Sequence, residues 1–190
     1  FTFNDRRYLS HGIESRLNVQ KNFWYMDITL DAGLRLHQDR VERDHRVTSM
    51  QMRAGQLLSS GEPKQQALLN QDTANALASF INMKLEFGYW TASAGLRWES
   101  IRGESIDYLS DTIQTNRDSV LMPGLGIFYQ FSSNAGMLFG VNKGFVPNSP
   151  GQEEGIAPEE SWNYEFGYRY GSDEFHGEVI GFFNDYRNLK

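Results

Sequence analysis

The sequence has no cysteine and no long hydrophobic run in its 190 residues. The absence of cysteine excludes disulfide bonds and thiolate metal sites, and it suits an oxidising compartment in which free thiols are a liability. Its apolar runs fall far short of the roughly 18 residues that indicate a transmembrane helix. A membrane β-barrel is still allowed, because its strands alternate apolar and polar side chains and never form such a run.

Basic and metal-binding side chains are also few. The 18 Lys and Arg residues are outnumbered by 24 Asp and Glu residues, which gives a net charge of -6. We therefore expect no nucleic-acid partner. The four histidines lack the spacing of metal ligands, and no nucleophile lies in a pattern with a base. We predict no catalytic residue, no metal site, no cofactor and no enzymatic activity.

Aromatic residues, by contrast, are abundant at 14% of the chain, and many alternate with polar ones. In residues 162–170 one parity holds Trp162, Tyr164, Phe166, Tyr168 and Tyr170. The other parity holds Asn163, Glu165, Gly167 and Arg169. Successive side chains of a strand point to opposite faces, so this segment has one aromatic face and one polar face. Interfacial Trp and Tyr opposite lumenal polar residues are typical of a membrane β-barrel strand.

The longest alternation covers residues 24–37. Apolar side chains occupy seven alternate positions, namely Trp24, Met26, Ile28, Leu30, Ala32, Leu34 and Leu36. This length exceeds the roughly 9–11 residues that a tilted strand needs to cross a bilayer. We predict further strands at residues 6–20, 77–87, 92–99, 121–131, 137–141 and 175–186. Parity alone does not assign the two faces of the last one.

Short turns and long polar connections alternate along the chain. The predicted turns lie at residues 21–22, 88–89, 132–134 and 171–173, and the connections at residues 39–75, 105–118 and 146–160. Within the first connection, residues 65–78 are rich in Ala, Gln and Leu and favour a short helix. Outer-membrane barrels sort their loops in this way, with short periplasmic turns and long external loops. We predict an all-β fold, an antiparallel up-and-down meander of about eight strands.

Five segments in the second half of the chain are informative as a series: SAGLRWE (93–99), LMPGLGIFYQFSSN (121–134), GVNKGFVPNSPG (140–151), PEESWNYEFGYRY (158–170) and FFNDYRNL (182–189). Together they resemble the barrel of TonB-dependent outer-membrane receptors. RRYLSHGIESRL (6–17) and GLRLHQDRVERDHR (33–46) are similar to the ferric-citrate, or iron(III) dicitrate, receptor type. The resemblance implies a 22-stranded transmembrane β-barrel closed by an N-terminal plug. We find no plug domain, TonB box or C-terminal closing strand, so we expect residues 1–190 to be a part of the barrel wall.

The resemblance also implies a function and a place in the cell. It implies active transport of a ferric chelate, such as iron citrate or a siderophore, across the outer membrane of a Gram-negative cell. The implied partners are the chelate, outer-membrane lipid and the inner-membrane TonB complex, which acts through the plug. Two alternatives stay open: a passive outer-membrane barrel such as a porin or adhesin, and a soluble carbohydrate-binding β-sandwich.

Cationic side chains follow the longest alternating segment. An anionic chelate requires cationic donors at the outer mouth, and the planar fork of arginine binds carboxylates through two parallel hydrogen bonds. We predict ligand binding by Arg40, Arg43, His45 and Arg46. The alternative for each is solvated charge that pairs with Asp39, Glu42 or Asp44. A second group lies on the polar parity of the strands and is expected to face the lumen: Arg35, Arg97, Glu99, Glu165 and Arg169.

Overall fold

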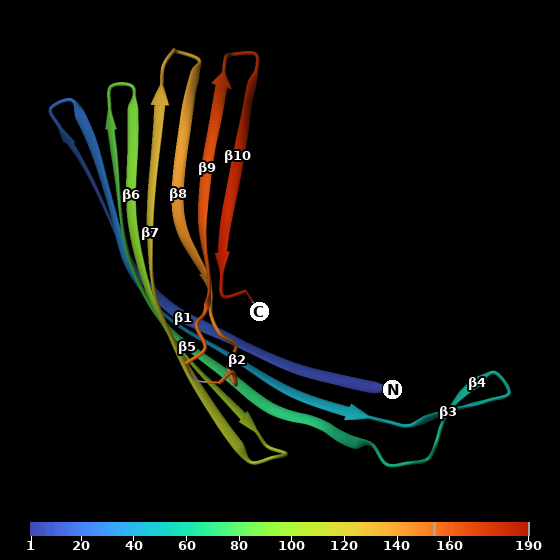
Figure 1. Ribbon diagram of the computed structural model, residues 1–190. Helices are drawn as coiled ribbons and strands as arrows, with labels where there is room; N and C mark the ends of the chain where they lie inside the picture. Colours follow the sequence, from blue (N-terminus) through green and yellow to red (C-terminus); the bar gives the residue numbers. More distant parts are fainter. Residues whose placement is uncertain (154, 190) are drawn as a thin grey trace.

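The computed structural model describes residues 1–153 and 155–189, and most of them form one antiparallel sheet (Figure 1). Within this described part the sheet has eight strands in the order β1-β2-β5-β6-β7-β8-β9-β10. Their bounds are Thr2–Phe23 for β1, Met26–Val47 for β2, Gln65–Phe87 for β5, Trp90–Asp107 for β6, Thr112–Gln130 for β7, Ala135–Val146 for β8, Glu159–Gly171 for β9 and His176–Arg187 for β10. The predicted meander of about eight strands is confirmed.

The sheet is open and curved and does not fold back into a globule. Its accessible surface is 13421 Å², whereas a compact protein of its mass exposes about 9,300 Å². Among the described residues the buried hydrophobic side chains are Ala78, Val120 and Ala135. No helix in this part of the chain is long and apolar enough to cross a membrane. In the described part of the chain the only other sheet is a two-stranded hairpin. This argues against the β-sandwich alternative, because a sandwich needs two large sheets that face each other.

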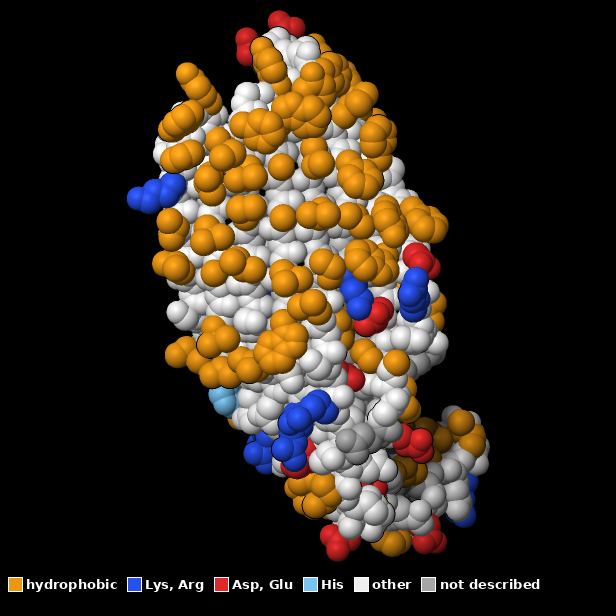
Figure 2. Space-filling model, turned by 60° about the vertical axis from the view of Figure 1, so that its left-hand side comes forward, with side chains coloured by type: hydrophobic (Ala, Val, Ile, Leu, Met, Phe, Trp, Pro, Cys, Tyr) orange, Lys and Arg blue, Asp and Glu red, His pale blue; other side chains and the backbone are white. Residues whose placement is uncertain are grey.

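The strand register collects the alternating apolar side chains on one face. Leu30 of β2 pairs with Val19 of β1 and Met83 of β5, and Phe166 of β9 pairs with Phe139 of β8. We call this surface the apolar face, and Figure 2 shows its rows of hydrophobic side chains. The opposite surface, the polar face, holds the ion pairs Arg16–Asp31, Lys84–Glu86, Arg97–Glu99 and Arg169–Glu178.

Aromatic rings gather on the apolar face near the short turns, at the end of the sheet that we call the turn end. Trp90 stacks on Tyr129 with ring centroids 4.3 Å apart. The ring of Phe131 lies 6.5 Å from that of Tyr129 and 6.2 Å from that of Tyr168. An aromatic belt of this kind is typical of the membrane–water interface of a barrel. The opposite end, which carries the longer connections, is the loop end.

Several strands run much further than the alternation indicated. Strands β1 and β2 have 22 residues each and β5 has 23. At about 3.3 Å per residue each spans about 70 Å, more than twice the bilayer core. The connections predicted at residues 39–75 and 105–118 are therefore wrong in their bounds, since most of both is strand. Beyond the apolar rows both faces carry polar side chains, so the apolar–polar alternation in the sequence stops. The backbone hydrogen bonds between strands nevertheless continue there.

The predicted helix at residues 65–78 is also wrong, because this segment belongs to β5. Pairing with β2 on one side and β6 on the other overrides the helix preference of its Ala, Gln and Leu residues. Between β2 and β5 a separate hairpin forms from β3 (Met50–Arg53) and β4 (Gln56–Ser59). The first short turn lies at Trp24 and Tyr25 and not at residues 21–22, and Trp24 has a positive φ of 60°.

Candidate functional site

The candidate site lies on the polar face at the loop end, where β2 and β5 extend beyond the apolar rows. The two strands stay in register from Met26 to His45, and a bulge follows at His45 and Arg46. Because strand side chains alternate, the predicted cations divide between the two faces. Arg43 and His45 share the polar face, whereas Arg40 lies on the opposite side of the sheet.

Arg43 belongs to a hydrogen-bonded cluster on the polar face. Its Nη1 lies 2.8 Å from Oδ2 of Asp72 on β5. The Oγ of Ser105 on β6 donates to Oδ1 of Asp72 at 2.6 Å. Asp72 is only 6% exposed, whereas the Arg43 side chain is 34% exposed. The buried carboxylate therefore anchors a guanidinium group that a solute can still reach.

Arg6, which the sequence analysis did not single out, completes this group. It is the direct ladder partner of Arg43, and Asn4 is the partner of His45. In the described part of the chain no acidic side chain pairs with Arg6. Like charges directly opposite one another across two strands repel, so this pair favours an anion between its members. Arg6 is identified as a site residue by the register of β1 with β2, and residue spacing in the sequence does not reveal that register.

Arg40 and Arg46 are engaged with neighbours away from this group. Arg40 Nη2 lies 3.0 Å from Oε1 of Glu42. Arg46 donates to both carboxylate oxygens of Asp44, at 3.0 and 2.6 Å. Hydrogen bonds from Arg46, and next from Gln66, hold the pKa of the Asp44 carboxyl below its usual value. We leave Arg46 out of the candidate site. Arg40 has the opposite strand parity from Arg43 but still lines the recesses beside it.

The connection between β8 and β9, residues 147–158, folds onto the polar face beside the group. Asp118 of β7 accepts hydrogen bonds from the backbone N and the side-chain Nδ2 of Asn148, at 2.7 and 2.8 Å. Asn116 Nδ2 donates to the carbonyl oxygen of Ser149 at 2.8 Å. Asp118 and Asn116 are each only 5% exposed. The connection is therefore fastened to the sheet by buried polar contacts.

A recess of about 480 Å³ lies between this connection and Arg43. Gly103 of β6 permits the close approach, because a Cβ at this position would lie 3.1 Å from Cα of Pro150. The size of the recess falls in the range of small-molecule sites. Its lining includes Tyr8, Ser10, Asp39, Arg40, Arg43, Asp72, Ser149 and Pro150. Arg6 lines a neighbouring recess of about 690 Å³, which it shares with Arg43 and Arg40.

The five charged residues that we expect to face the lumen share the polar face: Arg35, Arg97, Glu99, Glu165 and Arg169. Arg97 Nε donates to Glu99 Oε1 at 2.6 Å. Arg35 stands opposite Glu14 of β1, and Glu165 stands opposite Gly140 of β8. The open sheet does not itself enclose a lumen, so the lumenal position of these residues stays a prediction.

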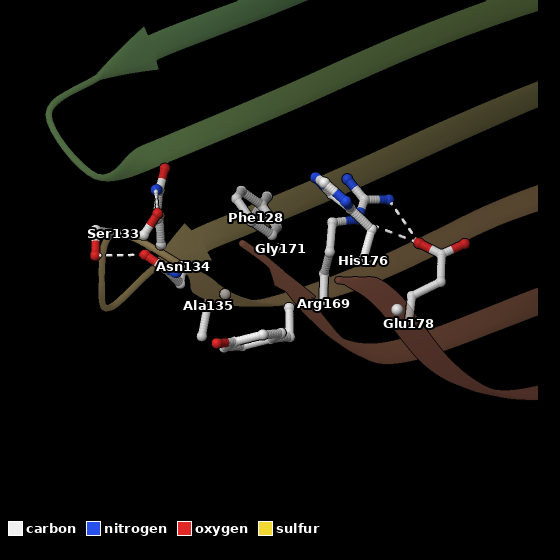
Figure 3. Close-up of a pocket in the computed structure, with 12 residues that line it drawn as sticks. Phe128, Ser133, Asn134, Ala135, Arg169, Gly171, His176 and Glu178 are labelled. Atoms are coloured by element: carbon white, nitrogen blue, oxygen red, sulfur yellow. Dashed lines mark hydrogen bonds and ion pairs between the residues drawn. The ribbon is translucent and has the colours of Figure 1, made fainter. Parts of the chain in front are cut away.

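A second recess, of about 560 Å³, lies on the polar face at the turn end (Figure 3). Arg169 donates to Oε2 of Glu178 at 3.1 and 3.0 Å, and its guanidinium carbon lies 5.7 Å from the centroid of the Phe128 ring. His176 lies beside this pair in Figure 3. Glu178 pairs with Arg169 here much as Asp72 pairs with Arg43, and we prefer the loop end as the anion site because Arg6 adds a second cation opposite Arg43.

The whole sequence supports one family assignment. A model described as TonB dependent receptor-like, beta-barrel, matches residues 1–189. The chain belongs to this family. It is a family of receptors whose known structures are outer-membrane β-barrels. No curated protein matches the sequence.

Solved receptors share the fold of this family member. The unliganded ferric citrate transporter FecA is 21% identical, with a TM-score of 0.84 over 97% of this chain and 28% of that chain. PiuA, a siderophore receptor from Acinetobacter baumannii, is 13% identical, with a TM-score of 0.68 over 92% of this chain and 32% of that chain. FyuA, the ferric yersiniabactin uptake receptor from Yersinia pestis, is 14% identical, with a TM-score of 0.68 over 99% of this chain and 30% of that chain. The chain thus spans less than a third of each receptor, and at these identities the likeness shows the fold alone.

Proposed function

We propose that this chain forms part of the wall of a TonB-dependent receptor that imports a ferric chelate across the outer membrane of a Gram-negative cell. The family assignment supports receptor function and favours it over a passive porin or adhesin. FecA is a ferric citrate transporter and FyuA is a ferric yersiniabactin uptake receptor, and we extend this ligand class to the present chain.

The observation that carries the ligand class is the pair Arg6 and Arg43 on the polar face at the loop end. Ferric chelates of the citrate type carry carboxylates, and each guanidinium group offers a planar fork of donors to such a group. His45 follows Arg43 on the same face, and its Nε2 is buried there with no hydrogen-bond partner among the described residues. The recess between Arg43 and the 147–158 connection, and the neighbouring recess that Arg6 and Arg43 line together, give the chelate a place to bind.

In this proposal the polar face also contacts the plug of the receptor. In the complete receptor it faces the lumen, and the plug packs against its charged side chains, including Arg35, Arg97, Glu99, Glu165 and Arg169. The inner-membrane TonB complex acts on that plug. The apolar face contacts outer-membrane lipid, because its rows of exposed hydrophobic side chains are favourable only in an apolar environment.

Chelate affinity tests the ligand class. We expect the Arg6→Ala/Arg43→Ala variant of the complete receptor to bind ferric citrate at least about tenfold more weakly, because one hydrogen bond to a charged group contributes about 1.5–3 kcal/mol. A fluorescence or calorimetric titration measures the change. Arg46→Ala is the matched control, since it removes one arginine from the opposite side of the same strand, where Arg46 bonds to Asp44, and leaves affinity unchanged. Wild-type affinity in the double variant removes this site from the proposal.

A further inference from the structure

A row of polar residues crosses five strands directly beyond the last apolar rows. Successive ladder partners on the apolar-face side are His11, Gln38, Asn75, Arg102 and Arg117, from β1 to β7. Gln38 Nε2 donates to Oδ1 of Asn75 at 2.6 Å. Figure 2 shows Lys and Arg side chains gathered just beyond the edge of the hydrophobic rows.

The row ends in two arginines that stand directly opposite one another, Arg102 on β6 and Arg117 on β7. Among the described residues, neither side chain forms an ion pair or a hydrogen bond. Other arginines of the sheet, such as Arg97 and Arg169, bond to a carboxylate. Two like charges in this arrangement destabilise the strand pair unless an anion bridges them. The geometry therefore favours an anionic ligand that lies across β6 and β7.

The same place also offers an apolar surface. Leu36 and Leu77 are ladder partners two residues nearer the turn end than Gln38 and Asn75. Together with Arg102 and Arg117 they line a recess of about 400 Å³. The recess thus joins unpaired cations to hydrocarbon side chains. A ligand that satisfies both halves is an amphiphile with an anionic head and an apolar tail.

We propose that Arg102 and Arg117 bind the phosphate headgroup of a membrane lipid. A phosphomonoester carries close to two negative charges, which match the two guanidinium groups, and its oxygens accept their forked donors. The acyl chains then lie over Leu36 and Leu77 on the apolar face. This inference rests on the membrane position in the proposed function, but it does not depend on chelate binding at the other face.

Lipid retention tests the site. The complete receptor is reconstituted in nanodiscs of phosphatidylcholine that contain phosphatidic acid, whose headgroup is a phosphomonoester. Native mass spectrometry then counts the phosphatidic acid that stays bound to the released receptor. We expect the Arg102→Gln/Arg117→Gln variant to retain at least about tenfold less phosphatidic acid than the wild type. The control, Arg7→Gln/Arg53→Gln, removes two arginines elsewhere and retains the wild-type amount.

Equal retention by the two double variants overturns the proposal. Displacement of the lipid by inorganic phosphate at an equal molar concentration assigns the site to the free anion and also overturns it. If the first double variant does not assemble, Arg117→Gln is compared with Arg7→Gln and must show the loss. Chelate affinity keeps the two proposals apart: Arg102→Gln/Arg117→Gln retains it, and Arg6→Ala/Arg43→Ala retains phosphatidic acid.

Discussion

Phe166 and Arg169 lie three positions apart on β9 and face opposite sides of the sheet. Phe166 is 59% exposed on the apolar face, between Phe139 of β8 and Gly181 of β10. Arg169 and its partner Glu178 on the polar face are 57% and 49% exposed. The environment of a side chain in this sheet therefore depends on its parity more than on its place along the strand.

This difference predicts unequal effects for two substitutions. Phe166→Arg places a charge on the lipid face at a cost of about 2–4 kcal/mol at mid-membrane. Arg169→Ala removes a solvated ion pair that contributes about 0–1 kcal/mol. We expect the first variant to impair assembly of the complete receptor or lower its unfolding temperature in detergent, and the second to resemble the wild type. Equal unfolding temperatures of the two variants count against the assignment of the faces.

At the scale of elements, the 147–158 connection leaves the plane of the sheet and lies against β7. Its contacts with β7 are polar and buried, so their loss is not compensated by water unless the connection moves away. Apolar packing of large side chains is scarce here, in contrast to the core of a globular protein. We infer that the Asp118–Asn148 contact holds the connection beside Arg43.

The Asp118→Ala variant tests this role. Each hydrogen bond to the carboxylate contributes about 1.5–3 kcal/mol, so we expect amide exchange in residues 147–158 to accelerate by about tenfold or more. Hydrogen–deuterium exchange of the complete receptor measures the change. The control is Asp173→Ala, which removes an exposed carboxylate from the β9–β10 turn. Unchanged exchange in Asp118→Ala contradicts the role given to this contact.

Two glycines, Gly103 and Gly140, provide an independent test of how closely the 147–158 connection packs on the sheet. A Cβ at Gly103 meets Asn116 and Pro150, whereas the nearest atoms to a Cβ at Gly140 are 3.9 Å away. Gly103→Ala should therefore displace the connection and reproduce the faster exchange, while Gly140→Ala should not. The same response from both alanine variants argues against close packing at Gly103.

At the scale of the whole molecule, the sheet has two edges and one large apolar surface. Strands β1 and β10 each pair with one neighbour in the described structure. Unpaired edges and extended apolar patches promote association. We expect residues 1–190, expressed alone, to aggregate in buffer and to require detergent for dispersion. Light scattering with and without detergent measures this, and a monodisperse monomer in buffer contradicts the orientation of the apolar face toward lipid.

The parity of residues 26–37 and 162–170 was readable from the sequence, because a strand with two different environments must alternate its side chains. Trp24 and Tyr25, which continue the first alternation, lie in the turn. For β10 the alternation alone did not assign the faces, because Ile180 and Phe182 lie on the polar face together with Glu178. The pairing of β10 with β9 determines which face each side chain occupies. The candidate site was predictable in part. Arg43 and His45 were found from the sequence, but Arg6 joins them through the ladder with β2.

The sequence by itself determined that this chain forms membrane-barrel-like strands and which side chains share a face of each strand, because that information is local and repeats every two residues. The tertiary structure decided where the strands end, that residues 65–78 are not helical, and which charges meet across strands. Hydrogen-bonded ladders and the fastening of the 147–158 connection join residues far apart in the chain. Such contacts leave no periodic signal in the sequence, so only the assembled sheet reveals them.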